Sequence, residues 1–117
     1  MPTITWTDPT VVKRAINSRT SLTDAQLTAM ITETMYAIST IMKTQRYVDD
    51  TVAWDDKYAV LRQAATAHVA MKVLASTSES IFSLTELATM LNVNYANYRE
   101  AMKLLEDQDY VNYLGSI

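Results

Sequence analysis

The fold of this chain is decided by residues 57–76, KYAVLRQAATAHVAMKVLAS. This stretch holds six alanines and neither glycine nor proline, a composition that favours a helix. Its apolar residues recur at alternating spacings of four and three, which places one set of them on a single face: Val60, Ala64, Ala67, Met71 and Leu74. Because the helix is apolar around most of its girth, we predict that it is the central helix of a small bundle, packed on several sides.

The composition limits the protein to a few classes. A chain of 117 residues is most simply one domain, and 49% hydrophobic residues allow a real core. One glycine and two prolines provide little turn chemistry for hairpins, which favours an all-α fold. The absence of cysteine excludes disulfides and thiolate sites, and a net charge of −3 provides no general attraction to nucleic acid. No basic, apolar leader and no apolar run near the ~20 residues of a membrane span is present, so we expect a cytoplasmic context and no membrane partner.

Three further helices are predicted around the central one. Asp8 and Pro9 are a start signal for a short helix over residues 9–16. Thr23 and Gln26 form a capping box that begins an amphipathic helix ending near Lys43. Its predicted core arc is Leu27, Met30, Ile31, Met35, Ile38, Ile41 and Met42. A last helix runs unbroken over about residues 83–108, with the stripe Leu84, Leu87, Ala88, Leu91, Tyr95, Tyr98, Met102 and Leu105.

The predicted architecture is therefore a bundle of about four helices over residues 8–108, with an extended arm at 1–7 and a tail at 109–117. The arm, the loop at 45–56 and the tail are rich in aromatic and apolar side chains that the predicted core does not use. Such segments suit contacts with other chains. The candidate interface residues are Trp6, Tyr47, Trp54, Tyr110, Tyr113, Leu114 and Ile117.

The sequence offers little catalytic chemistry. Two Asp-Asp pairs, at 49–50 and 55–56, suit a loop that caps the central helix, with a paired-carboxylate metal or acid–base site as the alternative. The single histidine, His68, lies among alanines and is more typical of a satisfied helix residue than of a catalyst. No metalloprotease, redox, dinucleotide, P-loop or nucleophile-elbow motif is present. We therefore predict a protein that is not an enzyme and has no catalytic, cofactor-binding or metal-binding residue.

Six segments follow one another in order along most of the chain, from about residue 5 to about residue 107. They are TDPTVVKRAIN at 7–17, SLTDAQLTAMITETMYAISTIM at 21–42, a loop with Arg46 and Tyr47, LRQAATAHVAMKVLAS at 61–76, LTELATML at 84–91 and YREAMKLLE at 98–106. Together they resemble the head–tail connector (adaptor, or head-completion) proteins of long-tailed double-stranded DNA phages. The order and spacing of these segments carry more weight than any one of them. The final helix is longer than in many members of that family.

The resemblance implies a helical bundle without catalysis or cofactor. It implies a homo-oligomeric ring, typically a dodecamer, in the neck of the virion, made in the host cytoplasm and joining the portal protein to a tail-side connector or tail terminator protein. The genome DNA would pass through the lumen without sequence-specific binding. We expect the arm, the loop and the tail to reach neighbouring subunits or these partners.

Residues 83–111 read SLTELATMLNVNYANYREAMKLLEDQDYV. This stretch carries a second, local resemblance, to the helix-turn-helix of winged-helix bacterial regulators. The supporting helix would be 85–91, the turn 92–94 and the recognition helix 95–105. Against it, the recognition helix would offer only Arg99 and Lys103 as cations, although phosphate contacts dominate affinity for DNA. Only six residues follow Val111, too few for a wing. A sharp turn at 92–94 would favour this DNA-binding regulator, and a continuous helix the connector.

Overall fold

The computed structural model describes residues 6–16, 22–44, 47, 58–76 and 84–114. These form the helices α1 (Pro9–Ala15), α2 (Asp24–Met42), α4 (Ala59–Ser76), α5 (Leu84–Leu105) and α6 (Gln108–Leu114). No strand occurs in this described part of the chain, and the prediction of an all-α bundle is confirmed.

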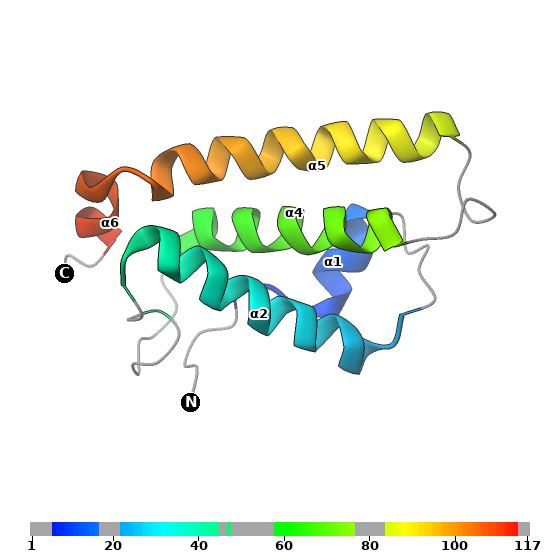
Figure 1. The fold of residues 1–117 in the computed structure, drawn as a ribbon, viewed down its shortest axis with the longest axis horizontal. Helices are drawn as coiled ribbons and strands as arrows, with labels where there is room; N and C mark the ends of the chain where they lie inside the picture. Colours follow the sequence, from blue (N-terminus) through cyan, green and yellow to red (C-terminus); the bar gives the residue numbers. More distant parts are fainter. Residues whose placement is uncertain (1–5, 17–21, 45–46, 48–57, 77–83, 115–117) are drawn as a thin grey trace.

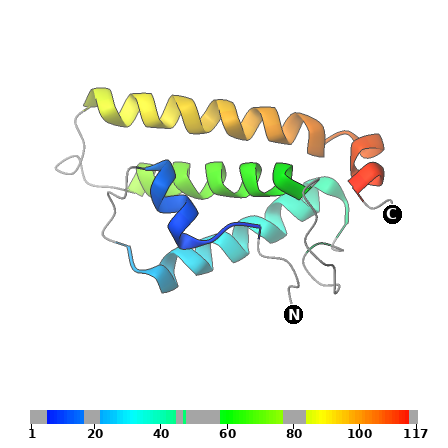
Figure 2. The same ribbon diagram turned by 180° about the vertical axis from the view of Figure 1, so that it is seen from behind.

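Helix α4 occupies the centre of the bundle. It lies between α2 and α5 in both views, and α1 packs against it as well (Figures 1 and 2). Its fully buried residues come from several sides of the helix: Leu61, Ala64, Ala65, Val69, Ala70 and Val73. The alanines let the neighbouring helices approach closely, and each buried leucine or valine side chain stabilises the fold by about 1.5–3 kcal/mol relative to an exposed one. The prediction of a helix packed on several sides is therefore confirmed.

The start of α2 is fixed by its capping box. The backbone N–H of Gln26 donates to Thr23 Oγ1 at 3.2 Å, and the N–H of Thr23 donates to Gln26 Oε1 at 2.9 Å. Two backbone donors that have no partner within the helix are thereby satisfied. The helix ends where Lys43 takes a left-handed conformation with φ of 62°. This start and this end agree with the prediction made from sequence.

Helix α1 begins as predicted, with the Asp8 carboxylate accepting a hydrogen bond of 3.0 Å from the Val11 N–H. Lys13 Nζ then lies 2.6 Å from Asp24 Oδ1, which joins α1 to the first residue of α2. Because this ion pair is exposed to water, it contributes less than ~1 kcal/mol to stability.

Helix α5 runs without interruption through residues 92–94. The side chain of Asn94 is buried, and its Nδ2 donates to the carbonyl oxygens of Met90 at 2.8 Å and Ala15 at 3.4 Å. A polar side chain is tolerated inside this helix because its donor group is satisfied. The prediction of one unbroken helix is confirmed as far as Leu105.

The end of the chain differs from the predicted tail. Helix α6 turns back onto the bundle after Leu105, and Val111 and Leu114 join the core (Figure 1). Gln108 Nε2 donates to the carbonyl oxygen of Met42 at 3.1 Å, which ties the start of α6 to the end of α2. The boundary placed at residue 108 is wrong, because burying these two aliphatic side chains is more favourable than leaving them in water.

Candidate interaction surface

Trp6 and Tyr47, two of the predicted interface residues, lie inside the protein. Trp6 is 0% exposed, and its indole Nε1 donates to the Tyr47 carbonyl oxygen at 3.2 Å. The Tyr47 ring packs edge-on against Tyr58, with ring centroids 5.2 Å apart. The expectation that these aromatic side chains remain outside the core is wrong, because the fold provides both an apolar site and a polar partner for the indole.

Polar contacts hold residues 6 and 7 of the predicted arm against α4. Arg62 Nε donates to the carbonyl oxygen of Trp6 at 3.0 Å, and Thr66 Oγ1 donates to Thr7 Oγ1 at 2.7 Å. Both donors come from polar residues of α4. Residues 6 and 7 are thus part of the folded domain. Residues 1–5 lie outside the described residues, so for them the extended arm stays a prediction.

The predicted tail residues divide between the core and the surface. Leu114 is 0% exposed, so its expected availability to a partner is also wrong. Tyr110 is half-buried, and Tyr113 is 55% exposed, with the two ring centroids 5.9 Å apart. Burial, and secondarily Tyr113, raise the pKa of the Tyr110 phenol. Tyr113 is therefore the accessible member of this group, while Trp54 and Ile117 lie outside the described residues.

The outer sides of α2 and α5 expose apolar side chains that the sequence reasoning assigned to the core or passed over. Ile41 on α2 is 40% exposed and Tyr95 on α5 is 52% exposed, although both belonged to predicted core stripes. Val93 and Leu104 on α5 and Tyr36 on α2 are exposed as well. The helical period predicts which direction the apolar face of a helix points but not how wide that face is. Whether a residue at the edge of the face is buried therefore depends on which helix packs against it.

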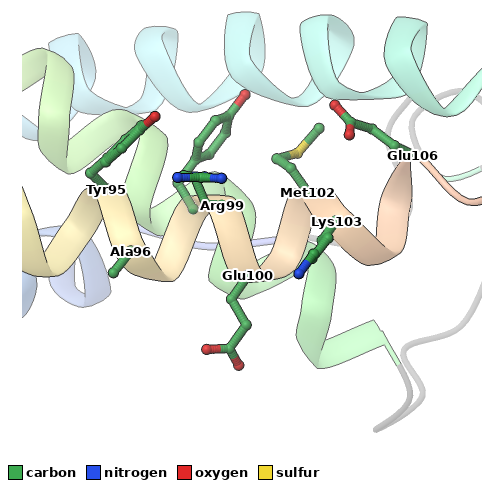
Figure 3. A pocket seen from close by; sticks show the side chains of 8 residues that line it. Tyr95, Ala96, Arg99, Glu100, Met102, Lys103 and Glu106 are labelled. Atoms are coloured by element: carbon green, nitrogen blue, oxygen red, sulfur yellow. The ribbon is translucent and has the colours of Figure 1, made fainter.

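A shallow hollow of about 530 Å³ follows the exposed side of α5 (Figure 3). Tyr95, Arg99, Met102 and Glu106 line it, and the Arg99 guanidinium lies 5.8 Å from the centroid of the Tyr95 ring. Acidic and basic side chains alternate along this surface, because Glu100 and Lys103 also border the hollow. An open surface of this kind, with an aromatic ring held by a cation, suits contact with another macromolecule.

His68 connects the three long helices inside the bundle. Its Nδ1 lies 3.0 Å from Thr34 Oγ1 on α2, and its ring lies 5.4 Å from the ring of Tyr98 on α5. The pKa of His68 is lowered, mainly by burial and secondarily by the charge of Lys72. The pKa of Tyr98 is raised, mainly by burial and secondarily by the charge of Glu106. Thr34 is fully buried, so its hydroxyl does not meet a substrate from solvent. Through these two contacts His68 joins α4 to α2 and α5, and its Nδ1 has a hydrogen-bond partner. This agrees with the interpretation of His68 as a satisfied helix residue.

The described residues contain no group of three or more histidine, aspartate or glutamate side chains arranged to hold a metal ion. The two Asp-Asp pairs, with both of their interpretations, lie outside the described residues. None of the helices in the described part of the chain is long and apolar enough to cross a membrane.

The second resemblance requires a turn that the structure does not contain. Residues 92–94 lie within α5, so the predicted supporting and recognition helices are one straight element. A helix-turn-helix needs its second helix to diverge from the first in order to enter the major groove. The predicted helix-turn-helix is therefore wrong in its geometry.

Comparisons with known proteins give no assignment. No protein-family model, no curated protein and no solved structure matches this chain.

Proposed function

We propose that this chain is a structural subunit of the neck of a tailed double-stranded DNA phage, where copies form a ring that joins the portal to the tail. The proposal rests on the ordered resemblance of residues 5–107 to head–tail connector proteins. The single observation that supports it most is the unbroken course of α5 through residues 92–94, because the competing regulator requires a turn there. In this proposal the protein acts through surfaces and is not an enzyme.

The distribution of exposed side chains agrees with such a role. Apolar residues remain exposed to water on α2, α5 and α6 of the single chain: Tyr36, Ile41, Val93, Tyr95, Leu104 and Tyr113. Interfaces are enriched in aromatic residues, and tyrosine in particular supplies a large, amphipathic contact area. Among the described residues of the predicted tail, Tyr113 is therefore the proposed interface residue, and the Tyr110 ring lies beside it.

The charge of the chain agrees with DNA that slides through a lumen. A net charge of −3 gives no attraction to the phosphate backbone, and the exposed cations Arg99 and Lys103 are accompanied by Glu100 and Glu106. Affinity for duplex DNA depends on the number of phosphates that lysine and arginine neutralise. We therefore expect no stable complex with duplex DNA at moderate salt.

The direct test is co-expression with the portal protein encoded in the same genome. We expect a stable complex in size-exclusion chromatography with light scattering, and a ring of this chain stacked on the portal in electron microscopy. The chain alone is the control for self-assembly. Failure to bind the portal, or tight binding of duplex DNA in a gel-shift assay at moderate salt, would overturn the proposal.

A further inference from the structure

A cleft of about 330 Å³ lies where α1, α4 and α5 meet. Helix α1, in dark blue, packs across α4 while α5 runs alongside α4 (Figure 2). Apolar side chains line one part of the cleft: Val11 and Ala15 of α1, and Ala59 and Ala67 of α4. Three amide side chains line another part: Gln63 of α4, and Asn94 and Asn97 of α5. The cleft therefore combines an apolar wall with amide groups from two helices.

The amide oxygen of Asn94 has no partner although its side chain is buried. Asn94 is 4% exposed, and its Nδ2 donates to the carbonyl oxygens of Met90 and Ala15. Because only an N–H group can face two carbonyl oxygens, these contacts fix the orientation of the amide. Its Oδ1 accepts no hydrogen bond within the described part of the chain, and Asn94 lines the cleft. Buried acceptors are normally paired, so a donor from outside the chain has to reach Oδ1.

The amide of Gln63 is oriented by the same kind of contact. Its Nε2 donates to the backbone carbonyl oxygen of Asn97 at 2.9 Å, which leaves Oε1 without a partner among the described residues. The side-chain amide of Asn97 is exposed and makes no hydrogen bond with the described residues. The cleft thus offers two oriented acceptors, on α4 and α5, and one further amide that can donate or accept.

The charge around the cleft favours a neutral occupant. Arg62 is the charged residue among those that line it, and no acidic side chain of the described chain does so. A cationic ligand would therefore meet a guanidinium and find no carboxylate. The peptide backbone is neutral and carries both N–H donors and C=O acceptors. In an extended segment, the N–H groups of alternate residues lie on the same side, roughly 6.5–7 Å apart, so two of them can reach acceptors on one wall.

We propose that this cleft binds a short extended segment of a partner protein through its backbone. Two N–H groups of the segment donate to Asn94 Oδ1 and Gln63 Oε1, and the Asn97 amide donates to one of its carbonyl oxygens. The volume is at the lower end of the range for ligand pockets, about 300–1,000 Å³, so the segment carries small, neutral side chains. The inference goes beyond the proposed function and does not depend on it, because the lining residues alone define the ligand.

Binding of synthetic peptides to the full chain is the first test. The probe is a library of N-acetylated, C-amidated pentapeptides built from glycine, alanine, valine, serine and threonine. We expect members of the library to bind at millimolar concentration and to shift the side-chain amide signals of Gln63, Asn94 and Asn97 in NMR spectra of the labelled protein. A library without a binder, or shifts confined to other residues, would overturn the proposal.

Methylation of single backbone nitrogens separates backbone recognition from side-chain recognition. Each N-methyl group removes one N–H donor and leaves the side chains of the peptide unchanged. We expect two positions, separated by one residue, at which methylation weakens binding about fivefold or more, and little effect at the others. A peptide that tolerates methylation at every position would contradict recognition of its backbone.

Substitutions on the protein locate the site. Gln63→Met keeps the length of the side chain and removes the acceptor, and Asn97→Ala removes the exposed amide. Each should weaken peptide binding about three- to tenfold, while circular dichroism shows an unchanged fold. Asn92→Ala is the matched control, because Asn92 is also exposed on α5 but does not line the cleft. Equal weakening by Asn92→Ala, or no weakening by the other two variants, would overturn the proposal.

A competitor distinguishes peptides from nucleobases, which also carry neutral N–H donors. Single-stranded oligo-deoxyadenosine is titrated into the labelled protein together with the tightest peptide of the library. We expect the peptide to stay bound, since the net charge of −3 gives the chain no general attraction to phosphates. Displacement of the peptide at equal concentration would overturn the proposal in favour of a nucleobase site. Peptide binding without any binding to the portal would support the cleft and contradict the phage role.

Discussion

The indole N–H of Trp6 donates a hydrogen bond of 3.2 Å to the backbone carbonyl of Tyr47, a residue 41 positions away in the sequence. This bond joins the first described segment of the chain to a residue between α2 and α4. The Trp6 carbonyl in turn accepts from Arg62 of α4, so the tryptophan is bound on both its side chain and its backbone. The arm therefore contributes to the stability of the monomer.

Replacement of Trp6 by alanine should lower the free energy of unfolding by about 3–5 kcal/mol, because a fully buried aromatic side chain is removed and leaves a cavity. Trp6→Phe should cost less, since it retains most of the apolar surface and loses the hydrogen bond to Tyr47. Urea denaturation followed by circular dichroism measures both. A Trp6→Ala variant as stable as the wild type would show that this residue is exposed in solution.

Leu114 and Tyr113 provide a matched pair at the end of the chain. Leu114→Ala should destabilise the monomer by about 2–5 kcal/mol, because its side chain is fully buried in the core. Tyr113→Ala should change stability by less than ~0.5 kcal/mol, because that side chain is exposed, and should instead weaken assembly. Thermal unfolding gives the first comparison and light scattering the second. The opposite ranking of the two stabilities would mean that α6 does not pack as described.

Protonation of His68 should destabilise the protein as the pH falls. Burial lowers the pKa of His68 below the ordinary histidine value of about 6.5, so the unfolded chain binds a proton at a pH where the folded protein does not. The stabilisation by neutral His68 is present above the unfolded pKa and is lost progressively as the pH falls from about 6.5 towards the lowered folded pKa.

The control for this pH dependence is His68→Asn, because the side-chain amide provides both a donor and an acceptor for the Thr34 hydroxyl but does not titrate. We expect the wild type to lose more unfolding free energy than the variant between pH 7.5 and pH 5.5, measured by urea denaturation. Parallel losses in the two proteins would assign the effect to other groups, such as the carboxylates.

Ser39 offers a substitution that should not weaken the fold. Its side chain is fully buried in α2, and its Oγ has no hydrogen-bond partner within the described part of the chain. Ser39→Ala removes the desolvated hydroxyl and leaves a better helix former, so stability should stay equal or rise by up to ~1 kcal/mol. Thr34→Ala is the contrasting variant, because it removes the hydrogen bond to His68 and should destabilise. A marked loss of stability in Ser39→Ala would reveal a partner for this hydroxyl.

The sequence by itself determined the elements whose signals are local. The capping box of Thr23 and Gln26 lies within four residues, and it fixed the start of α2. The alanine-rich composition of residues 57–76 fixed both the helix and its central place, because small apolar residues on all sides require neighbours on all sides. The continuity of α5 followed from a stripe that residues 92–94 do not interrupt.

Only the tertiary structure decided which apolar residues near the edges of these elements are covered. Trp6 and Leu114 are buried because they join a core that other segments of the chain complete, and the indole of Trp6 finds its hydrogen-bond acceptor at Tyr47, 41 residues away. Tyr95 and Ile41 are exposed because no described helix lies over that part of their faces. Burial depends on which surfaces meet after folding, and a helical period carries no information about the neighbour that covers it.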